Sequence, residues 1–367
     1  MSAARSDSSG RFWLRCLLGL VIVALLVGGT LAYQLFLFLR MPGDYPPREV
    51  EVTVTPGMSF SALARELAAE GVITSEKKFV FYARYKKMTN IKSGRFRVNT
   101  GWSPAKVLDQ LVNGLPYLER VTIPEGLAWW ETGRRLEQAG LVRFEDFEKV
   151  IHDPAFLRHW GIPFPSAEGF LFPDTYLIGR PLELNEASAR SVAGRMVDTF
   201  WRRTAGLWPE GKRPGPGKAG LVRDRVRLAS IVEKETAVPN ERARVAGVYA
   251  NRLQAGMRLQ ADPTVIYGLG PSFSGPIRRS QLNDAGNPYN TYQKNGLPPG
   301  PICSPGLASL AAAFAPEQHK FLYFVAVGDG SHTFSTNLRD HNSAVDLYRQ
   351  NVRRGQNPPA APRGQGS

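Results

Sequence analysis

Residues 50–73, VEVTVTPGMSFSALARELAAEGVI, hold a strand, a turn and a helix in one short stretch. Valine stands at every second position at its start, a period that predicts a β-strand with one buried face. A Pro-Gly pair then predicts a turn. Leu63 and Leu67 follow with helical spacing, so the stretch predicts a strand and a helix that pack together through their apolar faces.

The same layout returns at residues 121–142, VTIPEGLAWWETGRRLEQAGLV. Gly126 and Gly140 stand 14 positions apart, as Gly57 and Gly71 do, and the two pairs are offset by 69 residues. Shared spacing of this kind indicates an internal repeat. We therefore expect one strand, turn and helix unit to be used twice.

The segments around these copies predict an α+β protein with two folded parts. Between the copies, FVFYARYKK predicts a helix, GRFRVN a strand, and GWSPAKVLDQLVNG a helix that begins after Ser103 and stops at Gly114. Residues 50–118 are thus expected to form a small α+β module. Residues 119–352 are expected to form a larger α+β domain.

An apolar segment precedes the first strand. Residues 16–39 run for 24 residues without a charge, and about 20 apolar residues cross a bilayer as a helix. We expect a retained transmembrane helix instead of a cleaved signal peptide, because the run is long and no A-x-A site closes it. Arginines in residues 1–15 place the N-terminus in the cytoplasm. The chain after a Pro-rich linker at residues 40–49 would then lie outside a bacterial inner membrane.

The chain is basic and poor in cysteine. It has 46 Lys and Arg against 32 Asp and Glu, a formal charge of +14 that favours anionic partners. No zinc-finger spacing, basic heptad or RNA-binding aromatic motif accompanies the charge, so nucleic acid is not an expected partner. Cys16 lies in the apolar segment and Cys303 far outside it, so no intramolecular disulfide is expected. The composition of residues 353–367 predicts a disordered tail.

Motifs for nucleotide, metal and serine chemistry are incomplete. Residues 206–220 form a Gly-, Pro- and Lys-rich insertion that we expect to be flexible. Its GLWPEGKR stretch spells most of a phosphate-binding loop, but Arg213 replaces the Ser or Thr that would hold magnesium. The five histidines are scattered, and His332 and His341 fit local hydrogen bonding better than a metal site. No G-x-S-x-G motif is present, and no metal or cofactor is expected.

Two glutamates end a helical pattern in LASIVEKETAVPNER, residues 228–242. At about 100° per residue, Glu235 shares a helix face with Ile231 and Val232. Glu233 points about 160° away from it. Burial on an apolar face and a position near a helix C-terminus would both raise the pKa of Glu235 and make it a proton donor near neutral pH. Periodicity alone also allows a helix that ends one turn earlier and leaves Glu235 in solvent.

Polar and aromatic loops follow this helix. GMRLQADPTVIYGLG, NPYNTY, GLPPGPICSPG and SHTFSTN are rich in groups that hydrogen-bond or stack on a carbohydrate. The upstream stretch AEGFLFPDTY, residues 167–176, adds Glu168 and Asp174 beside aromatic side chains. Together these loops indicate a carbohydrate site around Glu235.

The run IVEKETAVPNERARVAGVYANRLQAGMRLQADPTVIYGLG, followed by YNTY, GLPPGPICSPG and HTFSTN, closely resembles the endolytic murein transglycosylases of the YceG-like family. EGFLFPDTY is similar to the family's upstream motif, and a single span before a small LysM-like module matches its layout. The resemblance covers residues 12–352 apart from the insertion. It implies that the second glutamate of E-K-E-T, here Glu235, is catalytic. The implied reaction cleaves the β-1,4 bond between N-acetylmuramic acid and N-acetylglucosamine in nascent peptidoglycan and leaves 1,6-anhydro ends.

One carboxyl group suffices for that reaction, whereas ordinary glycosidases need two. The group protonates the leaving oxygen and then, as a carboxylate, accepts the proton of the sugar's own C6 hydroxyl as this attacks C1. The residues expected to position the substrate are Glu168, Asp174, Gln260, Asp262, Tyr289, Asn290 and Asn337.

The resemblance also implies partners. Peptidoglycan glycan strands would be the substrate, and peptidoglycan synthases (penicillin-binding proteins) would be contacted, with cleavage ending strand elongation. Two other interpretations stay open at this point. One is a non-catalytic, membrane-anchored glycan-binding scaffold for wall synthases. The other is a hydrolytic muramidase, in which Asp262 or Glu168 would serve as the second carboxylate.

Overall fold

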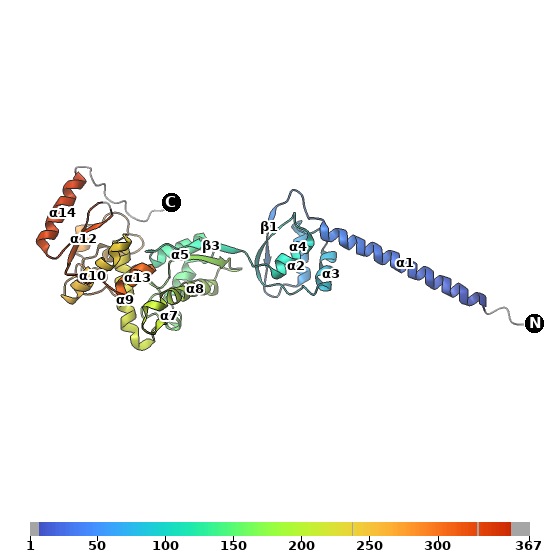
Figure 1. Cartoon of the computed structure of the whole chain (residues 1–367), viewed down its shortest axis with the longest axis horizontal. Coiled ribbons are helices and arrows are strands. Elements are labelled where there is room, and N and C mark those ends of the chain that lie inside the picture. Colours follow the sequence, from blue (N-terminus) through green and yellow to red (C-terminus); the bar gives the residue numbers. More distant parts are fainter. Residues whose placement is uncertain (1–6, 237, 329, 354–367) are drawn as a thin grey trace, which may run out of the picture. The chain divides into compact units, whose positions relative to one another are not determined.

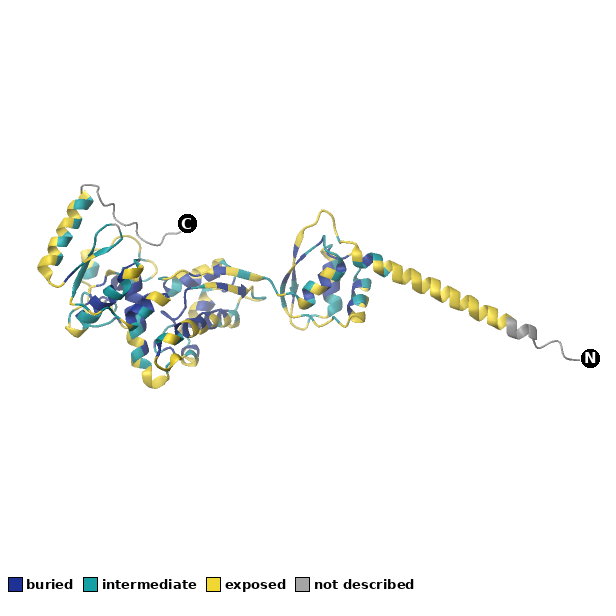
Figure 2. Cartoon of the chain, viewed as in Figure 1, coloured by how far each residue is buried: buried dark blue, intermediate teal, exposed yellow. Residues whose placement is uncertain are grey.

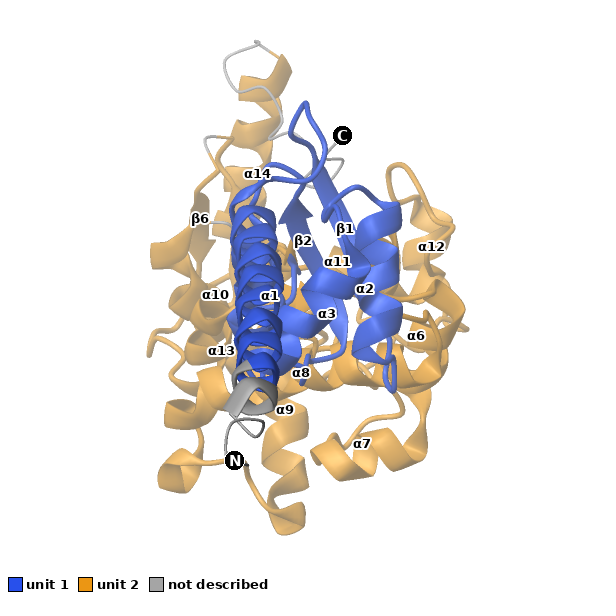
Figure 3. Cartoon of the chain, turned by 90° about the vertical axis from the view of Figure 1, so that its right-hand side faces the viewer, with its two compact units in different colours: residues 1–118 blue, residues 119–367 orange. Residues whose placement is uncertain are grey.

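The computed structural model describes residues 7–236, 238–328 and 330–353. The chain divides into two compact units, Met1–Leu118 and Glu119–Ser367 (Figure 3). Both units mix helices with short strands, which confirms the predicted α+β class (Figure 1). The expected disordered tail lies, from residue 354 on, outside the described residues.

Helix α1 (Asp7–Arg40) carries the apolar segment. From Phe12 to Arg40 it is long and apolar enough to cross a membrane, with a mean hydropathy of 2.4. Its apolar side chains are exposed along most of this length (Figure 2). A helix of this kind near the N-terminus is compatible with a single-pass anchor and also with a signal sequence.

The end of α1 and the linker belong to the first unit. Phe38, near the end of the helix, is buried in that unit's core. The backbone N–H of Gly43 donates to the carbonyl of Thr100 over 2.8 Å, and that of Asp44 donates to Gly71 over 2.9 Å. The Pro-rich linker is therefore held against the small module by its own backbone.

The first unit packs three helices against a two-stranded sheet. Its further elements are β1 (Glu49–Val54), α2 (Phe60–Ala69), α3 (Glu76–Tyr85), β2 (Gly94–Asn99) and α4 (Pro104–Asn113). β1 runs antiparallel to β2, with Val52 opposite Phe96. Both side chains are fully buried, together with Leu67 of α2 and Phe79 of α3. The apolar faces predicted from the sequence thus form one core.

A serine precedes each of α2, α3 and α4 and fixes where the helix starts. The hydroxyls of Ser59, Ser75 and Ser103 each accept a hydrogen bond from the backbone N–H three residues later. This satisfies a donor that has no partner inside the helix. The helix predicted between Ser103 and Gly114 is confirmed.

The second unit opens with the repeated layout. Its first elements are β3 (Leu118–Thr122), α5 (Trp129–Gln138), α6 (Phe144–His152), α7 (Pro154–Trp160) and β4 (Thr175–Gly179). β4 pairs with β3, as β2 pairs with β1. The order strand, helix, helix, strand therefore occurs in both units, with α7 added in the second.

The insertion follows the long helix α8 (Glu186–Thr204). It contains the short 3-10 helices η1 (Ala205–Leu207), η2 (Pro209–Gly211) and η3 (Pro216–Lys218). Trp208 is 3% exposed, its indole N–H donates to the Thr204 hydroxyl, and its ring lies 4.8 Å from that of Phe314. This one buried tryptophan anchors the segment to the core.

Helix α9 (Ala219–Glu235) is the central element of the second unit. It packs against α10 (Arg242–Gln254), α11 (Asp262–Leu269) and α13 (Leu307–Phe314). All six side chains from Leu228 to Glu233 are buried. A helix covered on several sides has no single apolar face. The sequence pattern therefore predicts the burial of one face of α9 but not that of the others. The remaining elements are η4 (Pro239–Glu241), α12 (Arg279–Leu282), β5 (Tyr323–Ala326), β6 (His332–Ser335) and α14 (Leu338–Arg353).

Candidate active site

Glu235 is the last residue of α9, the central helix of the second unit. The residue is partly buried. Tyr249, which is 2% exposed on α10, donates its hydroxyl proton to Glu235 Oε1 over 2.8 Å. The helix thus extends to Glu235, and the alternative that it ends a turn earlier is wrong.

The surroundings of Glu235 change its acidity. The pKa of Glu235 is raised to about 7, chiefly by burial and in smaller part by the nearby negative charge of Asp262. The hydrogen bond from Tyr249 and the positive charge of Arg252 oppose this rise in pKa because they favour the carboxylate. A group with a pKa near neutrality holds and releases a proton with similar ease, which general acid–base catalysis requires.

Two charged residues frame this carboxyl. Asp262, the first residue of α11, is exposed and accepts the hydroxyl proton of Tyr292 over 2.6 Å. Arg252 of α10 is buried, with its Nε donating to the carbonyl of Leu322 and its Nη1 to that of Leu259. Arg252 therefore holds the backbone around the site in place, and its positive charge also lowers the pKa of Glu235.

Glu233 occupies a different environment. Its Oε2 accepts the backbone N–H of Gly306 over 2.9 Å, and its Oε1 lies 3.9 Å from Arg242 Nη2. The same guanidinium lies 3.9 Å from Glu125. Burial and the Glu233 charge raise the pKa of Glu125, whereas Arg242 lowers it. The two glutamates of the E-K-E-T motif thus have separate partners, as their angular separation predicts.

Glu168 is a second carboxyl with altered acidity. It is 1% exposed, and its Oε2 accepts the backbone N–H of Trp129 over 2.9 Å. Burial raises the pKa of Glu168 to about 8, although hydrogen bonds from Trp129, Gly169 and the Tyr267 hydroxyl oppose the rise. Its contacts join the start of α5 to α11.

Three aromatic rings form a row beside Glu168. The ring of Tyr267 lies 5.0 Å from that of Trp130 and 4.8 Å from that of Tyr289. All three side chains are only partly buried. Of these, the sequence led us to Tyr289 alone. The sequence offered one indication for Trp130. It stands beside Trp129 at the start of a helix, and neighbouring helix residues point in different directions, so only one of the two can face the core.

Gln260 and Asn290, two further predicted site residues, differ in their exposure. Gln260 is exposed beside Asp262 and has a left-handed backbone conformation with φ of +53°. Asn290 is fully buried, and its Nδ2 donates to three carbonyls, those of Gln281, Leu282 and Asp284. Its amide therefore holds the loop that presents Tyr289.

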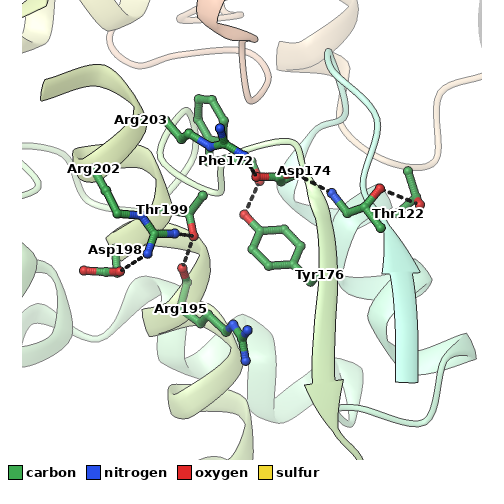
Figure 4. Close-up of polar contacts among 10 residues, drawn as sticks. Thr122, Phe172, Asp174, Tyr176, Arg195, Asp198, Thr199, Arg202 and Arg203 are labelled. Carbon is green, nitrogen blue, oxygen red and sulfur yellow. Dashed lines mark hydrogen bonds and ion pairs between the residues drawn. The ribbon is translucent and has the colours of Figure 1, made fainter. Parts of the chain in front are cut away.

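Asp174 and Asn337 have contacts of another kind. Asp174 lies just before β4, and its Oδ2 pairs with Arg203 Nη2 of α8 over 2.9 Å (Figure 4). Asn337 precedes α14, where its Oδ1 accepts the backbone N–H of Asp340. Within the part of the chain that the structure describes, neither side chain forms a hydrogen bond or ion pair with Glu235 or Tyr249.

His332 and His341 have partners other than Glu235. His332 Nδ1 lies 2.7 Å from Glu241 Oε2, and His341 stacks on Tyr323. Within the described ranges, no cluster of three His, Cys, Asp or Glu residues is arranged to hold a metal. A pocket of about 420 Å³ lies between the first half of α9 and α10, and Glu235 is not among its lining residues.

A partly buried acid with a pKa near 7, placed at a helix end among polar and aromatic loops, is suited to acid–base chemistry on a polar substrate. The YceG-like family matches residues 52–347, and the chain belongs to this family.

Known relatives cover most of the chain. An endolytic murein transglycosylase of Bacillus subtilis strain 168 is 28% identical over 339 residues, which are 88% of this chain and 91% of the relative. An endolytic murein transglycosylase of Streptococcus pneumoniae strain D39 is 28% identical over 358 residues, 89% of this chain and 63% of the relative. A crystal structure of a yceG-like protein from Listeria monocytogenes matches with a TM-score of 0.51 and 29% identity, covering 81% of this chain and 99% of that one.

Proposed function

We propose that this protein is an endolytic peptidoglycan transglycosylase that cuts the β-1,4 bond between N-acetylmuramic acid and N-acetylglucosamine in nascent strands. The observation that carries the proposal is the Glu235 carboxyl at the end of the buried helix α9, with the Tyr249 hydroxyl at 2.8 Å. Membership of the YceG-like family and the names of the Bacillus and Streptococcus relatives support the same reaction class.

Glu235 would act twice in one turnover. The protonated carboxyl gives its proton to the glycosidic oxygen as the bond from that oxygen to C1 breaks. The resulting carboxylate then takes the proton of the C6 hydroxyl, whose oxygen bonds to C1 and closes the 1,6-anhydro ring. No water is consumed, and Glu235 ends protonated as it began. Tyr249 stabilises the carboxylate between the two steps, because a hydrogen bond to a charged acceptor is stronger than one to a neutral group.

The loops around Glu235 would position the substrate. Asp262 and Gln260 are exposed next to each other at the start of α11, where they are available to sugar hydroxyls. Tyr289 offers a partly buried ring, and Glu168 sets the position of the α5 start through the Trp129 N–H. Asn290 contributes by holding its loop, and Asp174 and Asn337 by bracing β4 and α14.

The small module would hold glycan in the manner of a LysM-like domain. A pocket of about 330 Å³ opens between the turn at residues 54–60 and the loop at residues 89–93. The described residues that line it combine polar and apolar types and include no charged residue, which suits a neutral sugar better than a charged ligand.

Helix α1 would serve as the single-pass anchor, with its N-terminus in the cytoplasm and both folded units outside the inner membrane. Exposed apolar side chains along α1 support burial in lipid. Anchored in this way, the enzyme would meet strands as peptidoglycan synthases, the penicillin-binding proteins, release them, and its cut would end elongation.

Cleavage in water labelled with heavy oxygen tests the proposed function. The full-length protein in detergent is incubated with uncrosslinked glycan strands, and the products are weighed by mass spectrometry. We expect anhydro-ended products that carry no heavy oxygen. Hydrated, labelled ends would make the protein a muramidase, with Asp262 and Glu168 as candidates for its second carboxylate. Strands that are bound but uncut would make it a scaffold.

A further inference from the structure

The strand, helix, helix, strand unit occurs twice, and the copies agree in backbone detail. Gly57 and Gly126 both have φ of +80°, and Gly71 and Gly140 have φ of +69° and +67°. These are left-handed conformations that favour glycine, so the two turns of each copy are built alike. β1 begins at residue 49 and β3 at residue 118, which is the offset of the glycines.

The cores of the copies also correspond. Leu67 of α2 and Leu136 of α5 are both fully buried, 69 positions apart. The ring of Phe60, which begins α2, stacks on Phe79 at 5.6 Å. Trp129, which begins α5, stacks on Phe144 of the next helix at 5.8 Å. The first aromatic of each helix therefore has the same packing role.

The next position differs between the copies. Ser61 follows Phe60 in the first copy, whereas Trp130 follows Trp129 in the second. Because the first copy folds with serine there, the fold of the unit does not need a large aromatic at this position. Trp130 is partly buried and turns its ring toward Tyr267 of α11.

The turn itself has a different neighbour in each copy. In the first, the turn after β1 lines the pocket of about 330 Å³. In the second, the turn contacts the active-site helix α9, because Lys234 Nζ donates to the Gly126 carbonyl over 3.1 Å. The Gly126 N–H donates to the carbonyl of Ser304, in the loop before α13, over 2.9 Å. The residue that makes the first of these bonds directly precedes Glu235.

A buried carboxyl then fixes the start of α5. Glu168, from the loop before β4, accepts the Trp129 N–H and bonds to the Tyr267 hydroxyl. Tyr267 is the middle ring of the row Trp130, Tyr267 and Tyr289, and the helix that carries it begins with Asp262, whose charge acts on Glu235. Helix α11 thus carries the middle ring of the row and begins with the residue whose charge acts on Glu235.

We propose that the second copy of the repeat supplies a glycan subsite beside Glu235, in which Trp130 stacks on a sugar ring and Glu168 is the positioning residue. This inference rests on the proposed function for its ligand, a peptidoglycan glycan strand. Flat, partly buried rings beside hydrogen-bonding groups match a pyranose, which presents C–H faces and hydroxyl edges.

Binding by an inactive protein tests the subsite separately from cleavage. In full-length Glu235→Gln protein, the Kd for uncrosslinked glycan strands is measured with Trp130 intact and with Trp130→Ser, the residue of the first copy. We expect Trp130→Ser to raise Kd roughly three- to tenfold and Trp130→Phe to leave it nearly unchanged. The control Phe81→Ala removes an aromatic that is 60% exposed in the first unit and should not change Kd.

An equal Kd for the Trp130→Ser and parent proteins would overturn the subsite, even if cleavage by the wild type were established. A raised Kd would support the subsite even if the wild type proved to cut no strands, since binding is measured without cleavage. If Trp130→Ser lowers Tm sharply, Trp130→Leu is compared with Trp130→Phe, because leucine keeps apolar volume without a ring face. Equal Kd values for Leu and Phe would again contradict stacking.

Discussion

The Tyr249 hydroxyl and the Glu235 carboxyl are joined by a 2.8 Å hydrogen bond between α10 and the end of α9. Tyr249 is nearly inaccessible, whereas Glu235 is partly exposed, so the bond points from the core toward the surface. Burial and Asp262 favour the protonated acid, while Tyr249 and Arg252 favour the carboxylate. The balance of these effects sets a pKa of about 7 for Glu235, and each can be changed by one substitution.

Tyr249→Phe removes the hydrogen bond and keeps the ring that packs edge-on against Phe324. Because the bond lowers the pKa of Glu235, its loss should raise that pKa. The reaction begins with the protonated acid, so the alkaline limb of the kcat profile should move to higher pH. Loss of a bond to a charged group, worth about 1.5–3 kcal/mol, should also lower kcat roughly ten- to a hundredfold. A pH–rate profile that keeps its wild-type shape would contradict this role.

Asp262→Asn should act in the opposite direction. The negative charge of Asp262 raises the pKa of Glu235, so its removal should lower that pKa and move the alkaline limb of the kcat profile to lower pH. Asp224→Asn is a matched control, because Asp224 is an exposed residue of α9 that pairs with Arg227. The same shift in both variants would point to a general effect of charge and not to Asp262.

Glu168→Gln tests whether this carboxyl is protonated in the folded protein. The folded pKa of Glu168 is raised from 4.5 to about 8, so folding favours its protonated form. The stability this provides is fully present below about pH 4.5 and is lost as pH rises toward 8. Glutamine cannot ionise, so the variant should gain Tm relative to wild type across that window. A Tm difference that is constant with pH would show that Glu168 is charged when folded.

Arg252→Met tests how far the site depends on a buried cation. Arg252 donates to the carbonyls of Leu322 and Leu259, and its loss leaves both without that partner. We expect the free energy of unfolding to fall by about 3 kcal/mol in chemical denaturation. Arg258→Met is the control, since Arg258 is exposed and should cost less than about 1 kcal/mol. Equal losses would mean that the buried bonds add little.

The repeat was predictable because glycine spacing and apolar periodicity are local properties of the sequence. Gly57 and Gly126 mark the same turn, and the structure gives them the same φ. The burial of Glu233 was not predictable, because its partner Gly306 comes from a loop 73 residues away. Periodicity reports that a helix has an apolar face, but it does not report how many neighbours cover the other faces.

The sequence could indicate only part of the geometry of the candidate site. The helix-face argument led to Glu235, whose environment depends mostly on its own helix and the next one. Loop composition grouped Asn290 and Asn337 with Asp262, although composition does not tell a side chain that braces its own loop from one that is free to meet a ligand. The structure separates them by their partners.

The most direct measurement is the product mass spectrum of full-length protein and its Glu235→Gln variant with uncrosslinked glycan strands. Wild type should release anhydro-ended fragments, one water lighter than hydrolysis products, and Glu235→Gln should release none while keeping its Tm and its binding of strands. Glu233→Gln, two positions away and able to keep the bond from Gly306, should retain activity. Anhydro-ended products from Glu235→Gln at the wild-type rate would contradict the assignment of Glu235 as the catalytic acid and base.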